Sequence, residues 1–492
     1  MVRAAGGILA PGIALLITAL YVPWFPEPDV ARWAVVFVAA LLASLSLWRA
    51  WFDRVDLSIA VFVAWCALSV LWSPDRLASV DGVEKLLAVA LCLMALRRLN
   101  TGWLVPAAVG GVIIATVMGS PFAGFGNPEF LVQFSLIALP MLSASVVGIA
   151  CGLILAAAVV MTPSLIPFTL ALGTPLLLPR WPAKAVCASV LGVVAVVVLM
   201  HSQEAWDGVG TRLDMFAGTI AAWLEHPVIG WGFGSFVYVF PAYQGAGEAF
   251  GLMPLSVEAR TYANAAHNEF LQLLMETGVV GFALAGWCVW ELFQGKHSWA
   301  LWVVAILCLT GFPLQSPATA MLAALAAARA VPSPTRRGSL PLVAVAGALA
   351  MGVVALSIPA KVMAQAHFSA VSRYYDPTVI DQKAAPLAAL NHANQAYELD
   401  PANPRLRLAL FQTAALSYRR FPNPDSRAAV DAAYAISRTA SPSDTLALVT
   451  RLQFLIARQE CFTSRECDSI ANELVRTASR KAEVRRLVSI YG

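Results

Sequence analysis

The stretch HNEFLQLLMETGVVGFALAGWCVWELF, residues 267–293, decides the fold because it joins a polar opening to a long apolar run. A bilayer core of roughly 30 Å needs about 20 apolar residues per helix, so this run predicts a membrane-spanning helix. It opens with His267, Asn268 and Glu269, an imidazole, an amide and a carboxylate at the mouth of the helix. Because histidine exchanges protons near neutral pH, this mouth is a candidate reaction site at a membrane surface.

The whole composition points the same way. Of the 492 residues, 59% are hydrophobic and only 13% are charged, which leaves too little polar surface for a soluble fold of this length. We expect an all-α, polytopic membrane protein with about 12 to 13 spans by the length rule. The expected spans lie at residues 6–22, 31–49, 56–72, 82–97, 103–119, 128–143, 145–161, 163–179, 183–200, 268–292, 298–314, 316–331 and 339–360. Several prolines leave the division between residues 128 and 180 open.

The charges predict an orientation. The net charge of +4 is small and the cations are scattered, which argues against nucleic-acid binding. Alternate connections carry the arginines and lysines that mark cytoplasmic loops. They are Arg3, Arg49, Arg54, Arg97, Arg98, Arg180, Lys184, Lys296, Arg329, Arg336 and Arg337. The predicted units are therefore N-terminal spans (1–200), an external loop (201–266), further spans (267–360) and an external tail (361–492). In a bacterium the external side is the periplasm.

The tail changes character, because charges return and apolar residues take the spacing of amphipathic helices. Residues 390–404 resemble the second helix and closing turn of a tetratricopeptide repeat, which predicts a small soluble helical domain of that kind. A generic helical bundle is the alternative. Cys461 and Cys467 lie in polar sequence, where they either form a disulfide or stay unpaired. Such a tail is also suited to docking other envelope-assembly proteins.

The external loop contains six acidic residues but only two arginines, Arg212 and Arg260. A guanidinium matches phosphate oxygens with two parallel bonds, so both arginines are candidates for binding an anion. The alternative is an ordinary salt bridge, for instance from Arg212 to Asp214 or Glu225. Further along, Gly230 and Gly232 predict a tight turn that a ligand can approach closely, or a re-entrant segment.

His267 also has two interpretations. A histidine at the start of a helix is often a hydrogen-bonded surface residue. A helix N-terminus, however, offers free amides and a positive dipole end to an anion, and the dipole favours a neutral imidazole that can accept a proton. In this second interpretation Asn268 or Glu269 orients the ring.

Three blocks of sequence resemble the superfamily of O-antigen ligases and O-antigen polymerases, which are bacterial membrane glycosyltransferases. The blocks are Gly126-Asn127-Pro128-Glu129, Gly210-Thr211-Arg212 through His226-Pro227 to Gly234, and Ala266-His267-Asn268-Glu269 through Glu276 to Gly281. The likeness extends over about residues 1–331. The last span and the tail lie beyond the minimal ligase pattern.

The resemblance implies transfer of a glycan from undecaprenyl pyrophosphate to lipid A-core at the periplasmic face of the inner membrane, with inversion and with no metal or other cofactor. It implies His267 and Arg212 as catalytic residues. The implied diphosphate-binding residues are Arg212, Arg260, Gly230 and Gly232, and the supporting residues are Asn127, His226, Asn268 and Glu269. Expected partners are the lipid-linked donor, a glycolipid or glycan acceptor, and membrane lipids.

Two alternatives remain at this point. A polymerase that joins lipid-linked repeat units shares every motif used above. A membrane transporter also has many spans, but its mark would be charged residues at mid-membrane depth. The expected spans contain few of these, Glu276 and Glu291 among them. Accumulation of lipid-linked glycan on gene loss would indicate a transferase, whereas reduced solute uptake would indicate a transporter.

Overall fold

The computed structural model describes residues 28–47, 52–98, 104–117, 128–141, 203–243, 265–295, 299–331, 341–373, 385–440, 445–457 and 465–478. These residues form helices and turns, and no strand occurs among them. The all-α prediction is thus confirmed for the described part of the chain. The spans expected at 6–22, 145–161, 163–179 and 183–200 lie outside it.

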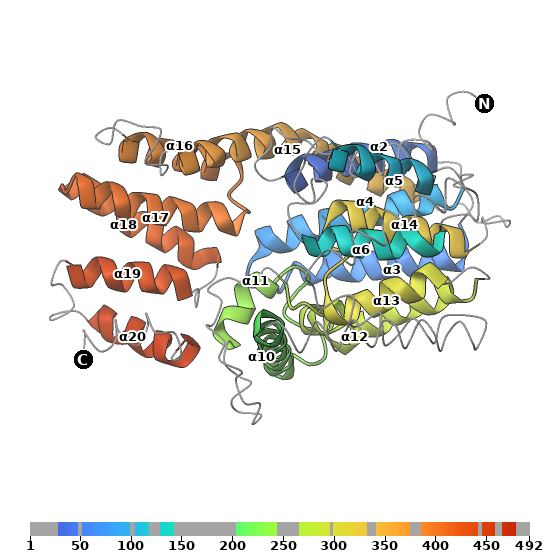
Figure 1. Ribbon diagram of the computed structural model, residues 1–492, viewed down its shortest axis with the longest axis horizontal. Coiled ribbons are helices and arrows are strands. Elements are labelled where there is room, and N and C mark those ends of the chain that lie inside the picture. Colours follow the sequence, from blue (N-terminus) through green and yellow to red (C-terminus); the bar gives the residue numbers. More distant parts are fainter. Residues whose placement is uncertain are drawn as a thin grey trace.

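One helical bundle fills the right-hand side of Figure 1. Its helices are α2 (Pro28–Leu47), α3 (Arg54–Ser69), α4 (Arg76–Leu96), α5 (Leu104–Val117), α6 (Pro128–Ala138), α12 (Glu269–Phe293), α13 (Trp299–Thr310), α14 (Pro317–Ala330) and α15 (Pro341–Arg373). A short 3₁₀ turn, η2 (Leu139–Met141), continues α6. The core between the helices is apolar, with Phe37, Leu91, Phe134 and Leu325 buried in it.

By length and composition, two helical segments among the described residues suffice to cross a membrane, Glu269–Phe293 and Val345–Val371. Three shorter apolar helices are Glu129–Ala138, Ala300–Leu309 and Pro317–Ala330. The helices match nine of the expected spans in position, but most are shorter than a span requires. The number of spans and their orientation remain predictions.

A buried ion cluster joins the start of α3 to the end of α4. Arg97 donates to Asp53 Oδ2 and Asp56 Oδ1, each at 2.6 Å, and Arg98 donates to Asp56 Oδ2 at 2.8 Å. Asp53 also caps α3 by accepting from the Asp56 amide. The Arg97 and Asp56 side chains are both 0% exposed. Their buried ion pair therefore holds the start of α3 against the end of α4.

We expect Arg97→Ala to lower the free energy of unfolding by about 3–5 kcal/mol, because it removes one partner of a buried pair. The exposed Arg54 of the same region provides the control, Arg54→Ala. Thermal unfolding in detergent and the steady-state level of a fluorescent fusion measure the difference. Equal stability of the two variants would contradict the prediction.

The segment predicted as an external loop begins with a helix, α10 (Gln203–Glu225), which lies between the bundle and the tail in Figure 1. A Gly-rich turn, residues 226–235, follows it. Next come α11 (Phe236–Val239) and the 3₁₀ turn η3 (Phe240–Tyr243). Met215 of α10, Phe236 and Phe240 form a separate small core with Met275 of α12. This core positions the loop against the start of α12.

The tail is a stack of helices at the left of Figure 1: α16 (Ala385–Leu399), α17 (Pro404–Arg420), α18 (Pro424–Ala440), α19 (Thr445–Ala457) and α20 (Arg465–Ala478). Each contacts the next along the chain, and Phe411, Leu448 and Phe454 lie in a core of their own. Helix α15 continues to Arg373, so it crosses the boundary expected at 360. Whether the stack is a tetratricopeptide fold remains a prediction.

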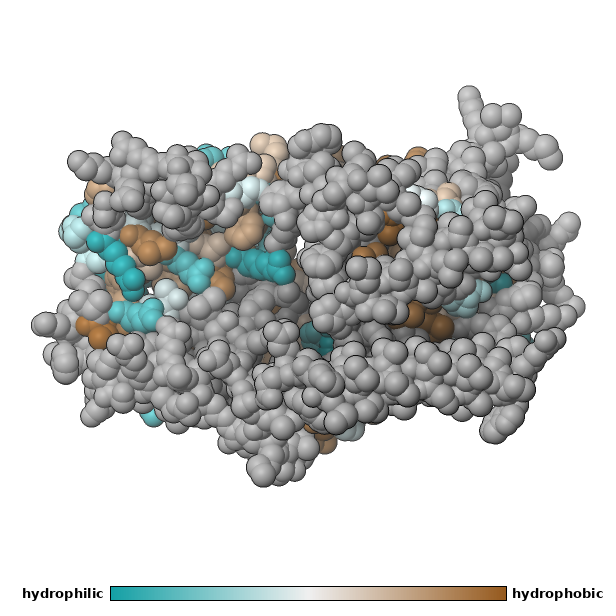
Figure 2. Space-filling model, in the orientation of Figure 1, coloured by the Kyte–Doolittle hydropathy of each residue, from teal (hydrophilic) through white to brown (hydrophobic). Residues whose placement is uncertain are grey.

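The tail and the bundle differ in their surface and in their cysteines. In Figure 2 the most hydrophilic side chains visible on this face gather over the tail, beside hydrophobic ones, and side chains of both kinds are visible over the bundle. Cys467 is disulfide-bonded. Cys461 lies outside the described residues. In the bundle, Cys66, Cys92, Cys288 and Cys308 are free and buried.

Candidate active site

Arg212 lies on α10 and forms an ion pair with the first turn of α6. Its Nη2 is 2.7 Å from Glu129 Oε1, and the two side chains are 13% and 20% exposed. The sequence suggested Asp214 or Glu225 as salt-bridge partners, and the structure shows a partner that the sequence did not suggest, an acid 83 positions upstream. The pair connects the first and second sequence blocks. Asn127 and Arg260 lie outside the described residues.

The second and third blocks interlock through their backbones. Helix α12 is broken at Gly278, where φ is 63° and ψ is −174°, and the break interrupts the helical hydrogen-bond ladder. The Gly-rich turn compensates for it: Trp231 N donates to Met275 O at 3.1 Å and Gly232 N to Glu276 O at 2.7 Å. In return, Val279 N donates to Pro227 O at 3.0 Å and Val280 N to Val228 O at 3.2 Å.

Two glycines allow the backbones of the Gly-rich turn and of α12 to approach each other closely. A Cβ added at Gly278 would overlap the carbonyl of Val228, and one added at Gly230 would overlap the carbonyl of Glu276. Gly230 also has a positive φ of 70°, which L side chains rarely adopt. The sequence predicted a continuous span over residues 268–292, and the structure instead has a break at Gly278 that receives a loop.

The amides of the two predicted diphosphate-binding glycines are engaged inside the protein. Gly230 N donates to His226 O at 3.0 Å and Gly232 N to Glu276 O at 2.7 Å. Both glycines are buried. Both amides are therefore occupied by backbone carbonyls, and the role of these glycines in binding a diphosphate remains a prediction.

Glu276 fixes the far end of the Gly-rich turn. Its carboxylate accepts from Gly234 N at 2.8 Å, Phe236 N at 3.2 Å and Gln272 Nε2 at 3.1 Å, and the residue is only 3% exposed. The sequence showed Glu276 only as a charge inside an expected span. Such an acid in an apolar run is a signal for a functional role, but it does not name the partners.

His267 comes directly before α12 and has a φ of 55°, an uncommon value for a residue with a side chain. Asn268 caps the helix, since its Oδ1 accepts from Leu271 N at 3.0 Å. Glu269 Oε1 accepts from Leu314 N at 3.0 Å. The two residues expected to orient the imidazole therefore have these structural bonds as well.

Phe312 connects the histidine to the ion pair. Its ring meets His267 edge-on with centroids 4.7 Å apart, and it meets Phe130 edge-on at 5.1 Å. Phe130 is the neighbour of Glu129, which binds Arg212. Phe312, a residue that the sequence did not single out, thus contacts the third block directly and the first block through the neighbour of Glu129. His226 is exposed at the loop surface, with its ring 4.1 Å from that of Trp231.

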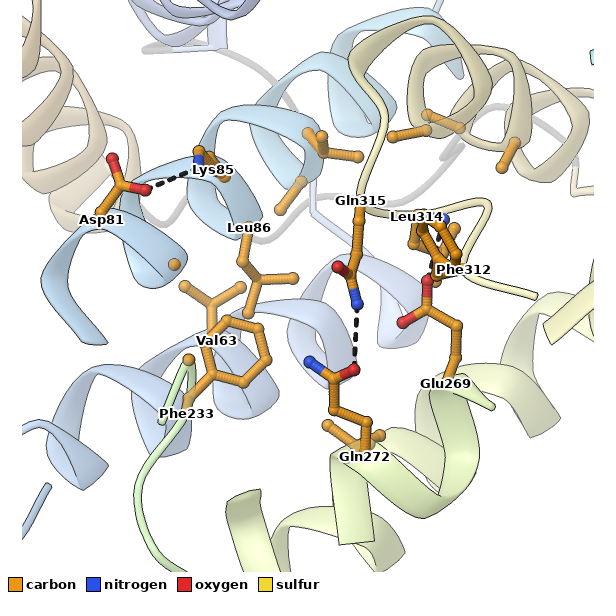
Figure 3. A pocket seen from close by; sticks show the side chains of 18 of the residues that line it. Val63, Asp81, Lys85, Leu86, Phe233, Glu269, Gln272, Phe312, Leu314 and Gln315 are labelled. Atoms are coloured by element: carbon orange, nitrogen blue, oxygen red, sulfur yellow. Dashed lines mark hydrogen bonds and ion pairs between the residues drawn. The ribbon is translucent and has the colours of Figure 1, made fainter. Parts of the chain in front are cut away.

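A cavity of about 1050 Å³ opens beside this site and has Phe312 in its wall. Glu269, Gln272 and Glu276 face it from one side of α12, as expected for residues three and seven positions apart. Gln272 Oε1 accepts from Ala266 N at 3.0 Å and from Gln315 Nε2 at 3.1 Å. Figure 3 shows this polar wall across from Asp81 and Lys85 of α4, with Phe233 and Leu86 between them. The cavity combines apolar and polar walls, as ligand sites do.

One comparison with known proteins found a match. The family model described as O-antigen ligase matches residues 86–286, a segment that includes Glu129, Arg212, the Gly-rich turn and His267. None of the curated proteins and none of the solved structures matched the chain.

Proposed function

We propose that this chain, whose residues 86–286 belong to the O-antigen ligase superfamily, transfers a glycan from undecaprenyl pyrophosphate to lipid A-core at the periplasmic face of the inner membrane. The family indicates O-antigen ligase or polymerase activity by a glycosyltransferase-like enzyme of the inner membrane. In general terms it also implies a lipid-linked glycan donor and a glycolipid acceptor.

The observation that carries the proposal is a series of contacts that leads from Arg212 through Glu129, its neighbour Phe130 and Phe312 to His267. Arg212 pairs with Glu129, and the ring of His267 packs on Phe312. Both side chains come from the segment that matches the family. A guanidinium binds phosphate oxygens with two parallel bonds, and a neutral imidazole accepts a proton. These are the two functions that glycosyl transfer from a diphosphate requires.

In the proposed reaction Arg212 binds the diphosphate of the donor and stabilises the negative charge that grows as it leaves. The acceptor oxygen attacks the anomeric carbon from the opposite side, so a new C–O bond forms while the bond to the pyrophosphate breaks. His267 takes the proton of the attacking hydroxyl. The anomeric carbon inverts in this single displacement. Because Arg212 supplies the positive charge, the mechanism uses no metal. Arg260 is the proposed second cation on the diphosphate.

Product analysis in a strain lacking the gene tests the function. We expect full-length glycan to remain on the lipid carrier, with none on lipid A-core, because the joining step is lost. A surface ladder reduced to one repeat would indicate a polymerase instead. Unchanged carrier and surface glycans with reduced solute uptake would contradict both and indicate a transporter.

An exchange of charges tests whether Arg212 acts on the donor or only pairs with Glu129. We expect Arg212→Ala and Arg212→Glu each to lower the transfer rate by about a hundredfold or more, since a charged donor to the leaving group is lost. The double variant Arg212→Glu with Glu129→Arg restores an ion pair but moves the guanidinium to α6. We expect its protein level to recover and its activity to stay low. Recovered activity would show that only the pair matters.

A further inference from the structure

The cavity beside the active site reaches beyond the family segment and ends on the tail. Asp400, Ala402, Asn403 and Arg405 line it, together with Lys361 of α15. The first three belong to the turn between α16 and α17, and Arg405 is in the first turn of α17. A domain that only recruited other proteins would not need to form a wall of this cavity.

A buried ion pair fixes this turn against the bundle. Arg407 Nη1 is 3.1 Å from Asp75 Oδ2, and the two side chains are only 4% and 6% exposed. Asp75 also caps α4 by accepting from Ala78 N at 3.2 Å, and Arg407 Nε donates to Pro401 O at 2.7 Å. Since breaking a buried pair is costly, the tail turn and the start of α4 stay in one arrangement.

The charges at this end of the cavity balance one another. Lys361 lies 2.8 Å from Asp81 and 3.3 Å from Glu84, and Lys85 lies 2.6 Å from Asp81. Over the whole lining, the carboxyl groups Asp29, Asp81, Glu269, Glu276 and Asp400 outnumber the cations Lys85, Lys361 and Arg405. Such a lining does not attract a diphosphate, which is better matched to Arg212 outside it.

The same lining fits a neutral, hydroxyl-rich molecule. Each sugar hydroxyl both donates and accepts, so it can bind between matched cations, carboxylates and amides. Trp33 and Phe37 add apolar surface to this wall, beneath Lys85 and Lys361 at 5.8 and 6.0 Å. A volume of about 1050 Å³ is at the upper end of ligand pockets and has room for more than one ring.

We propose that the α16–α17 turn, with Asn403 and Arg405, forms a binding subsite for the saccharide part of the acceptor. This inference rests on the proposed function. Phe312 contacts His267 and lines the same cavity that Arg405 lines. An acceptor with its hydroxyl at His267 therefore extends its glycan along the cavity toward the tail. The tail, outside the family segment, then selects the acceptor while the family segment handles the donor.

The test uses the full-length protein in detergent, with undecaprenyl-pyrophosphate-linked glycan as donor and lipid A-core as acceptor. Arg405 is exposed, so Arg405→Ala has little effect on folding. We expect it to raise the acceptor KM about tenfold, the value of one lost charged hydrogen bond, with kcat and the donor KM unchanged. Direct binding of lipid A-core weakens by the same factor. Arg419→Ala, at the exposed far end of α17, is the matched control and behaves as wild type.

A second variant distinguishes a loss of acceptor binding from a change in folding. Asn403 caps α17 by accepting from Arg405 N at 3.1 Å, and aspartate caps equally well, so Asn403→Asp keeps the cap while it removes the amide donor and adds a negative charge. It too is expected to raise the acceptor KM. An acceptor KM within twofold of wild type in both variants, or a shift in the donor KM instead, would overturn the subsite. If wild type binds lipid A-core through Arg405 but transfers nothing to it, the subsite stands and the proposed function fails.

Discussion

Replacing His267 by alanine is expected to lower the rate of glycan transfer by about 10²- to 10⁴-fold, the usual contribution of a general base. The imidazole lies at the start of α12 against Phe312, which also contacts Phe130, the neighbour of Glu129. In the proposed reaction the imidazole takes the proton of the acceptor hydroxyl. Initial rates with the purified protein, and surface-glycan profiles of cells at equal protein level, measure the loss.

The unusual backbone of His267 calls for a second substitution. With φ at 55°, alanine is strained at this position, and the loss of activity could come from the backbone. Asparagine tolerates this conformation and stays polar, but it does not titrate near neutral pH. We therefore expect His267→Asn to be as inactive as His267→Ala. An active His267→Asn variant would assign the role to the backbone and not to proton transfer.

The helical class followed from the sequence because apolar runs of this length have few other solutions in a membrane. Several helix starts were readable as well, since Asn268 and the Asn403-Pro404 pair are strong N-terminal signals. Arg212 was a candidate because the predicted external loop contains only two arginines. His267 was a candidate because this titratable side chain directly precedes a long apolar run. Their spatial relation was not readable, since nothing local indicates that Arg212 pairs with Glu129, which lies 83 positions upstream.

The break in α12 is a feature that the pattern of apolar residues in the sequence does not predict. Apolar residues continue on both sides of Gly278, so a continuous helix was the natural prediction for residues 268–292. The groups released by the break are satisfied by Pro227, Val228, Trp231 and Gly232, which are more than 40 positions upstream. A pattern within one segment carries no information about such tertiary bonds. The tail turn at Asn403 was missed as a cavity wall for the same reason.

Gly278→Ala is expected to abolish both the interlock and the activity. Any Cβ at this position overlaps the carbonyl of Val228, a backbone atom that moves only if the turn moves. The φ of 63° adds about 1–2 kcal/mol for a residue other than glycine. Without the interlock, four backbone hydrogen bonds across the break are lost together. We expect little folded protein, and transfer below detection, in membranes of cells expressing the variant.

Gly286→Ala is the matched control for this substitution. Gly286 lies on the same helix, and nothing lies within 4 Å of an added Cβ. Since alanine favours a helix by about 1 kcal/mol over glycine, this variant should be as stable as wild type or slightly more so. Protease resistance in membranes and transfer activity compare the two. Equal behaviour of Gly278→Ala and Gly286→Ala would mean that α12 is regular at residue 278.

Gly230→Ala approaches the same contact from the other side. Its Cβ would overlap the Glu276 carbonyl, which accepts the Gly232 amide at 2.7 Å. If Gly230 served the diphosphate through its backbone, alanine would impair donor binding and leave the folded level unchanged. If it serves the interlock, Gly230→Ala lowers the folded level as Gly278→Ala does. Because both glycines act on one contact, we expect the double variant to be no worse than either single variant.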